Sequence, residues 1–215
     1  MKDWSRFRLD DFSFANFPRG ARVLDVGCGE GEQLRQLEAN GCRAVGVEPN
    51  PQLVEQLRAR GLDVAEGYAE HLPFPDATFD GVVSKVVLPY ADERRAIKEW
   101  SRVLRPGGRV LACYHGAGYY VYYVLRGESL ALRAYGLRSL ISAWWYHLTG
   151  RRLPGWMGDT IFQSRRRLAR YYGEFGFRLD EAHPSPTFRG LDVFIYHELT
   201  LTTSTARNAP SHAAL

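Results

Sequence analysis

The chain has 215 residues, of which 45% are hydrophobic and 24% are charged, and its formal net charge is +4. This composition suits one globular domain with a full hydrophobic core. The mildly basic balance permits an anionic partner without requiring one, and no run of the sequence is long and apolar enough to span a bilayer.

Three cysteines, Cys28, Cys42 and Cys113, lie far apart in the sequence. Their odd number and wide spacing predict reduced thiols and no zinc or other metal site. The start of the chain has no apolar signal-peptide core, so we expect a cytoplasmic protein.

From residue 21 onwards, short apolar runs alternate with segments of helical periodicity. Strands are expected at 22–26, 43–47, 64–66, 81–84 and 109–114. Helices are expected at 32–40, 51–60 and 92–104. Strands that alternate with helices of this length predict βαβ units and a parallel sheet. Residues 1–20, aromatic and charged, are expected to form an N-terminal arm.

Residues 115–164 interrupt this alternation. They are rich in tyrosine, tryptophan, leucine and arginine, with helical spacing over 129–148. Because strands resume only after them, they are expected to form a helical lid insertion between strands five and six.

The end of the chain returns to regular elements. A helix is expected at 165–175, followed by strands at 177–182 and 191–199. The domain is therefore expected to span 21–201, and the small polar residues 202–215 to form a flexible tail.

The strongest functional signal is the glycine-rich run that follows the first strand, DVGCGEG at 25–31. A strand, a glycine turn and a helix place backbone amides where a ligand can approach the main chain closely. Such a turn alone is a weak signal. Glu48 strengthens it, because an acid about 20 residues further on can accept hydrogen bonds from ribose hydroxyls. The alternative is an acid that only favours the start of the next helix.

Five motifs occur in the order typical of class I S-adenosylmethionine (SAM)-dependent methyltransferases, and the chain resembles this family over about residues 20–115. The motifs are DVGCGEG at 25–31, GVEPN at 46–50, AEHLPF at 69–74, FDGVVS at 79–84 and RVLRPGG at 102–108. As a set, they resemble the ubiquinone/menaquinone-like methyltransferase domain. The resemblance implies an α/β, Rossmann-like three-layer sandwich. Its seven-stranded sheet would be mostly parallel with an antiparallel last strand, and SAM would lie along the carboxyl ends of the strands.

The resemblance also assigns a cofactor site, residue by residue. The residues expected to bind SAM are Asp25, Gly27, Cys28, Gly29, Gly31, Glu48, Pro49, Asn50, Ala69, Glu70 and Ser84. The glycine loop and Asp25 would hold the methionine part and Glu48 the ribose, while Pro49, Asn50, Ala69 and Glu70 would surround the adenine. Tyr68 stands where the family usually carries an acid that accepts from the adenine amino group.

Methyl transfer from a sulfonium is an in-line displacement, so the protein mainly aligns the acceptor and excludes water. Three candidate catalytic residues stand at strand ends: Lys85, Tyr90 and His115. His115 is the first candidate for a general base, because histidine titrates near neutrality; the alternative is a histidine that only hydrogen-bonds its loop. Lys85 either orients an anionic acceptor or reaches solvent.

The sequence therefore predicts a SAM-dependent methyltransferase (EC 2.1.1.-) with a small, hydrophobic or aromatic acceptor and leaves O-, N- or C-methylation open. The aromatic residues of 115–164 either line the acceptor site or only pack on the sheet. A third alternative is a lipid or isoprenoid acceptor, with peripheral contact of this segment with an anionic membrane. No nucleic-acid partner is expected.

Two other classes of protein were weighed. A nicotinamide-dependent oxidoreductase would carry a Gly-x-Gly-x-x-Gly turn, which this loop lacks. A protein that binds SAM without transferring the methyl group stays open because of Tyr68.

Overall fold

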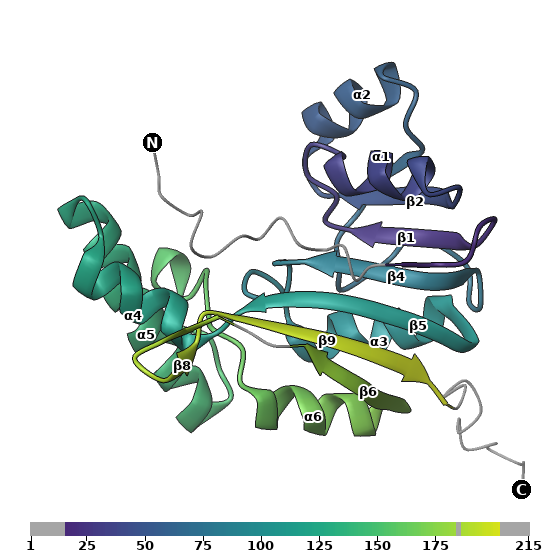
Figure 1. Ribbon diagram of the computed structural model, residues 1–215. Coiled ribbons are helices and arrows are strands. Elements are labelled where there is room, and N and C mark those ends of the chain that lie inside the picture. The colour runs from purple at the N-terminus through teal and green to yellow at the C-terminus, as the bar shows by residue number, and fades with distance from the viewer. Residues whose placement is uncertain (1–15, 184–185, 203–215) are drawn as a thin grey trace, which may run out of the picture.

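The computed structural model describes residues 16–183 and 186–202, and Figure 1 shows a single large sheet with helices on both faces. The strands of this sheet are β1 Arg22–Val26, β2 Arg43–Glu48, β3 Val64–Glu66, β4 Phe79–Lys85, β5 Leu104–His115, β6 Phe177–His183 and β9 Phe194–Leu201. The α-helices are α1 Glu32–Ala39, α2 Pro51–Ala59, α3 Glu93–Val103, α4 Ala117–Arg126, α5 Leu130–Thr149 and α6 Arg165–Glu174. A 3₁₀ turn, Gly155–Met157, and a small hairpin, β7 Thr187–Phe188 with β8 Leu191–Asp192, complete the described elements.

The seven strands lie in the order β3-β2-β1-β4-β5-β9-β6. All neighbouring pairs are parallel except those of β9, which runs antiparallel to both β5 and β6. The expected Rossmann-like α/β fold is therefore confirmed, with its antiparallel last strand. Helices α4 and α5, between β5 and α6, stand beyond the end of the sheet at which the parallel strands finish (Figure 1).

Alternation of side chains along each strand divides the core into two layers. In β1, Val23 packs on the face covered by α1 and α2, whereas Leu24 and Val26 pack on the face covered by α3 and α6. Trp100 of α3 is fully buried in the second layer. Removal of these apolar side chains from water on both faces holds the central strands in place and so positions the loops at their ends.

The expected strand at 191–199 is wrong in its extent, because the chain bends within it. Its first part is β8, which pairs with β7, and its second part is β9. Gly116 and Gly118 at the start of α4 lie directly against β8. A Cβ at Gly116 would stand 2.3 Å from the Asp192 carbonyl oxygen, and one at Gly118 would stand 2.3 Å from that of Leu191. The close approach of α4 thus decides where β8 ends.

The expected N-terminal arm lies mostly outside the described residues, and so does the expected tail beyond Thr202. Within the described part, Phe17 is buried over Gly81 of β4, where a Cβ would stand 2.2 Å from the ring. The Arg109 guanidinium lies 5.6 Å from the centre of the same ring. This segment therefore covers part of the sheet, while the domain boundaries stay predictions.

Candidate functional site

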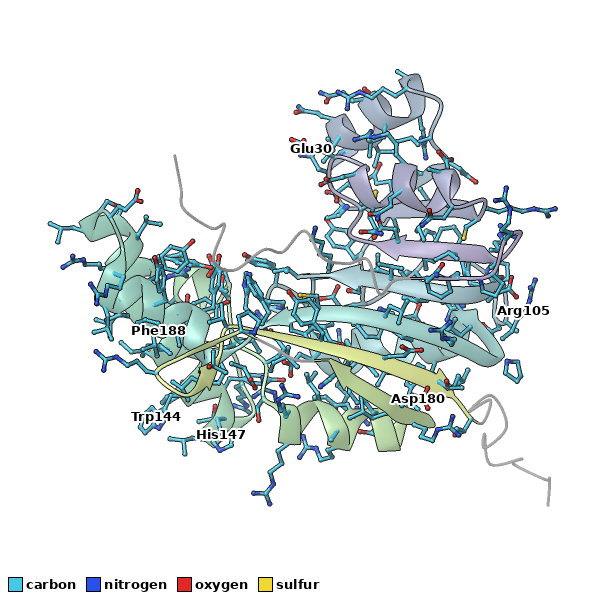
Figure 2. The ribbon with its side chains drawn as sticks, viewed as in Figure 1. Glu30, Arg105, Trp144, His147, Asp180 and Phe188 are labelled. Atoms are coloured by element: carbon cyan, nitrogen blue, oxygen red, sulfur yellow. The ribbon has the colours of Figure 1, made fainter. Side chains whose placement is uncertain are left out.

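A cavity of about 360 Å³ opens at the carboxyl ends of the central parallel strands. Its walls come from the loops after β1, β2, β3 and β4, and they are formed by Gly27, Val47, Glu48, Pro49, Gly67, Tyr68, Ala69, Glu70, Lys85, Val86, Val87, Tyr90 and Ala91. Ligands of open α/β sheets bind in this position. Figure 2 shows Glu30 of the glycine loop near this end of the sheet and Arg105 at the opposite end.

Seven of the residues predicted from the sequence line this cavity. They are Gly27, Glu48, Pro49, Ala69, Glu70, Lys85 and Tyr90. The other predicted residues do not line it, namely Asp25, Cys28, Gly29, Gly31, Asn50, Ser84 and His115. The fold therefore brings ribose-side and adenine-side candidates together at one cavity, with the glycine loop beside them.

The amides of the glycine loop are largely paired within the protein. The Gly27 and Cys28 amides donate to the Val47 carbonyl oxygen at 2.8 and 3.1 Å, and the Gly29 amide donates to Glu48 Oε2 at 3.2 Å. The loop folds back onto the end of β2, so these three amides have partners within the protein. These bonds hold the loop beside Glu48.

The loop needs glycine for its conformation. Gly27, Gly29 and Gly31 have φ values of +71°, +52° and +74°, a region that L-residues with side chains rarely adopt. A Cβ at Gly27 would stand 2.5 Å from Val87 Cγ2, whereas one at Gly29 would meet no atom within 4 Å. Gly29 therefore faces open space on the side where a ligand could approach.

The Cys28 side chain belongs to the core and not to the ligand side. Its sulfur packs against Gly46, where a Cβ would stand 2.8 Å from it. Burial, together with the nearby carboxyls of Asp25 and Glu48, raises the pKa of the Cys28 thiol to about 12. Cys28 is thus an unreactive thiol, and only its backbone is available to a ligand.

Glu48 ends β2 with its carboxylate at the cavity wall. Oε2 accepts from the Gly29 amide, and Oε1 accepts from the Asn50 amide at 3.1 Å. Each carboxylate oxygen can accept a further hydrogen bond, so Glu48 can still receive two hydroxyls. The Asn50 side chain is engaged elsewhere, because its oxygen caps α2 by accepting from the Gln52 and Leu53 amides.

Tyr90 connects the cavity wall to the helical segment 115–164. Burial raises the pKa of Tyr90, and the nearby Tyr135 of α5 raises it as well, so the phenol stays protonated. The Arg152 guanidinium fastens the same segment to this turn by donating to the Pro89 carbonyl oxygen at 3.3 Å and to that of Ala91. The lid and the cavity are thereby held together.

His115 ends β5 but lies behind the cavity. Its ring stacks on Tyr119 with centroids 3.7 Å apart, and Nδ1 lies 3.4 Å from the Tyr120 hydroxyl. Burial lowers the pKa of His115 to about 3, so its imidazole is neutral at physiological pH. This environment weakens it as a proton acceptor, and its role as general base stays a prediction.

Comparison with known proteins places this site in a family. Residues 24–112 match the family described as a methyltransferase domain. An uncharacterized methyltransferase of Mycobacterium tuberculosis is 40% identical over 91 residues, which are 41% of this chain and 37% of that protein. The 27-O-demethylrifamycin SV methyltransferase of Amycolatopsis mediterranei is 40% identical over 101 residues, which are 42% of this chain and 37% of that enzyme. The matches thus cover little more than a third of these relatives.

A solved SAM-dependent methyltransferase from Methanosarcina mazei has the same fold, with a TM-score of 0.65 at 19% identity over 90% of this chain and 98% of that chain. Residues 24–112 carry a methyltransferase domain. The chain has the fold of a SAM-dependent methyltransferase, and SAM is the cofactor that these matches imply.

Two buried polar atoms of the methyltransferase domain fit this cofactor. Asp25 is 2% exposed, and its Oδ2 has no hydrogen-bond partner among the described residues; the same is true of Ser84 Oγ. Buried polar atoms without partners often mark the place of a ligand group. A carboxylate suits the ammonium of the methionine part, and Glu48 suits the ribose diol, so the residues present fit SAM.

Five cavity residues of the methyltransferase domain were not among the predicted site residues: Val47, Gly67, Val86, Val87 and Ala91. Val86 has φ +61°, a conformation that β-branched residues rarely adopt. Backbone strain of this kind is typical of functional sites. The sequence carries no signal for it, because VVSKVV reads as a continuous strand.

The Asp25 carboxyl leads to a stability prediction for the SAM-free protein. Burial raises its pKa from 3.8 to about 7, Lys85 lowers it and Glu48 raises it. A carboxyl whose folded-state pKa is raised stabilises the protein fully at acidic pH, and this contribution is lost as the pH rises through about 7. We expect Asp25→Asn to be more stable than the wild type at about pH 8, by about 2 kcal/mol.

Urea unfolding at about pH 5 and about pH 8 measures this difference. The advantage of Asp25→Asn over the wild type should grow with pH. An advantage of the same size at both pH values would contradict a buried, pH-dependent charge at Asp25.

Proposed function

We propose that the protein transfers the methyl group of SAM to a small, hydrophobic or aromatic acceptor. The observation that carries the proposal is the cavity at the strand ends, with the Glu48 carboxylate in its wall and the buried, unpaired Asp25 Oδ2 near Glu48 and Lys85. The helical segment 115–164 is rich in tyrosine and tryptophan, whose apolar rings with polar tips suit a flat organic molecule. The proposal leaves open which atom is methylated and includes no nucleic-acid partner. A cytoplasmic location is supported by the three cysteines, which are buried and form no disulfide.

SAM, when bound, supplies an electrophilic methyl group on a sulfonium. The chain then has to hold the acceptor in line and keep water out. Tyr90 offers a hydrogen-bond donor at the cavity wall, because its phenol is protonated. Lys85 adds a positive charge to the same wall and favours an acceptor that carries negative charge.

A protein that binds SAM without transferring its methyl group is the second candidate. Tyr68, which stands in place of the acid usual in the family, is 63% exposed at the cavity rim. Calorimetric titration with SAM, its demethylated product and NADH tests cofactor binding. We expect both sulfur nucleosides to bind and NADH not to bind. A folded protein that binds neither sulfur nucleoside would contradict the proposed function.

Turnover is tested separately, by conversion of SAM to its demethylated product in the presence of hydrophobic acceptors. A protein that binds SAM yet converts it with none of them would favour the second candidate. A lipid or isoprenoid acceptor at a membrane surface is the third outcome, and it would appear as turnover only in the presence of vesicles.

His115→Ala tests the candidate general base. We expect turnover to fall by about a hundredfold, the lower range for general-base catalysis. SAM affinity should stay within about twofold, because His115 does not line the cavity. His115→Gln, which retains a hydrogen-bonding side chain without the titration, serves as the control. Wild-type turnover in both variants would remove His115 from the mechanism.

A further inference from the structure

Helix α5 carries an apolar stripe on its outer face. The stripe consists of Leu130, Leu137, Ile141, Trp144 and Leu148, and these side chains are between 45% and 84% exposed. Their spacings of seven, four, three and four residues place them on one side of the helix. The buried residues of α5 are small and lie on the opposite side: Gly136, Ser139, Ser142 and Ala143.

The stripe is therefore not the face by which α5 packs on the protein. Gly136 meets α4 so closely that a Cβ there would stand 2.7 Å from the Tyr120 carbonyl oxygen. Figure 2 shows Trp144 and His147 at the outer edge of the molecule, away from the sheet. Trp156 extends this apolar surface, since it is 72% exposed and lies beside the α5 residue Arg138. An exposed apolar surface of this extent is typical of an interaction site.

Positive charge is concentrated in the same part of the chain. Residues 126–170 hold nine arginines and no lysine, against the two acids Glu128 and Asp159, which is a balance of +7. The whole chain has a net charge of +4, so the remaining residues carry −3. Three of these arginines, Arg126, Arg151 and Arg166, are exposed and have no acidic partner among the described residues.

We propose that the outer face of α5 binds the surface of an anionic lipid bilayer. A helix with leucine and tryptophan on one side and arginine around it lies in the interface of such a bilayer, with its apolar side among the acyl chains. The surrounding arginines meet the anionic headgroups. None of the described helices is long and apolar enough to cross a bilayer, so the contact is peripheral.

The charge balance decides between the occupants that could cover this face. A second copy of the chain would add a second set of the exposed arginines Arg126, Arg151 and Arg166, and like charges would repel. A nucleic acid would neutralise the arginines but would leave the leucine and isoleucine side chains without an apolar partner. A bilayer with anionic headgroups satisfies both the stripe and the arginines.

This face lies beside the SAM cavity without closing it. Tyr135 of α5 lies near enough to Tyr90 of the cavity wall to raise its pKa, while none of the stripe residues lines the cavity. The bilayer would therefore contact the helical segment 115–164, which adjoins the cavity. Binding to the bilayer does not depend on methyl transfer, so the two proposals fail separately.

Sedimentation of the full-length protein with lipid vesicles, in the absence of SAM, tests the proposal. We expect binding to vesicles that contain phosphatidylglycerol and at least about tenfold weaker binding to vesicles of phosphatidylcholine alone. High salt should reduce the binding. Equal binding to both kinds of vesicle, or binding to neither, would overturn the proposal.

Matched variants locate the surface. Leu137→Ser, and more strongly Leu137→Ser with Trp144→Ser, should weaken vesicle binding by about tenfold or more with an unchanged Tm, because both side chains are exposed. Leu179→Ser is the control, since Leu179 is similarly exposed but lies on β6. Equal losses at Leu137 and Leu179 would contradict the assignment to α5.

Two further measurements address the rejected occupants. Sedimentation velocity should show the same oligomeric state for the wild type and the double variant. A dimer that dissociates in the double variant would show that a second copy covers the stripe. Binding of an RNA or DNA duplex that is tighter than vesicle binding and indifferent to Leu137→Ser would assign the arginines to a nucleic acid. Either result would overturn the proposal.

Discussion

Gly29→Arg is expected to lower SAM affinity by more than about a hundredfold, about 3 kcal/mol, while the protein stays folded. The Gly29 Cβ position faces open space within the glycine loop, so an arginine there would extend into the volume beside Glu48 without a clash inside the protein. It would also weaken the hydrogen bond that the Gly29 backbone N–H donates to the Glu48 carboxylate. Calorimetric titration with SAM measures the change.

Gly61→Arg is the matched control for this experiment. Gly61 also has a left-handed φ, +83°, with no atom within 4 Å of its Cβ position, but it follows α2 and lies outside the cavity. Both variants should lose about 1–2 kcal/mol of folding stability, because each places a side chain at a positive φ. Only Gly29→Arg should lose SAM affinity. Equal affinity in the two variants would remove the glycine loop from the cofactor site.

Arg167→Met is expected to destabilise the protein by about 3–5 kcal/mol, because it leaves a buried carboxylate without its cation. Arg167 of α6 donates to both oxygens of Glu93 at 2.6 and 2.8 Å, and the Glu93 side chain is fully buried. The Arg167 guanidinium also lies 5.1 Å from the Tyr146 ring of α5. Urea unfolding measures the loss, and it should include loosening of α5 from α6.

The adjacent Arg166→Met is the control, and it should change stability by less than about 0.5 kcal/mol because Arg166 is exposed. The double variant Glu93→Gln with Arg167→Met should recover most of the stability, since it removes the stranded charge as well. A double variant as unstable as Arg167→Met alone would show that packing of the Arg167 stem, and not the ion pair, holds α6 in place.

Local physical chemistry explains why much of the site was predictable from the sequence. The loop after β1 needs left-handed backbone at Gly27, Gly29 and Gly31, and glycine is the residue that adopts it freely. Glu48 could be placed at the same cavity because parallel strands bring their carboxyl ends to one edge of the sheet. The short apolar run of β1 is likewise typical of a parallel strand that is buried on both faces.

Other features depend on contacts between distant segments. The Gly27 and Cys28 amides pair with Val47, which spacing along the chain does not indicate. His115 stands at a strand end as expected, but Tyr119 and Tyr120 of the following helix cover it and lower its pKa. The burial of His115 depends on where α4 packs, and no sequence motif indicates the position of α4.

The sequence by itself determined the α/β class, the order of most strands and helices, and seven of the residues that line the cavity, because periodicity and glycine requirements act over a few residues. The tertiary structure alone decided which side of α5 stays exposed. Both its small-residue side and its leucine-rich side are compatible with burial, and close packing against α4 accommodates only the small one. Helical spacing tells which residues share a face, whereas the neighbouring element decides which face is covered.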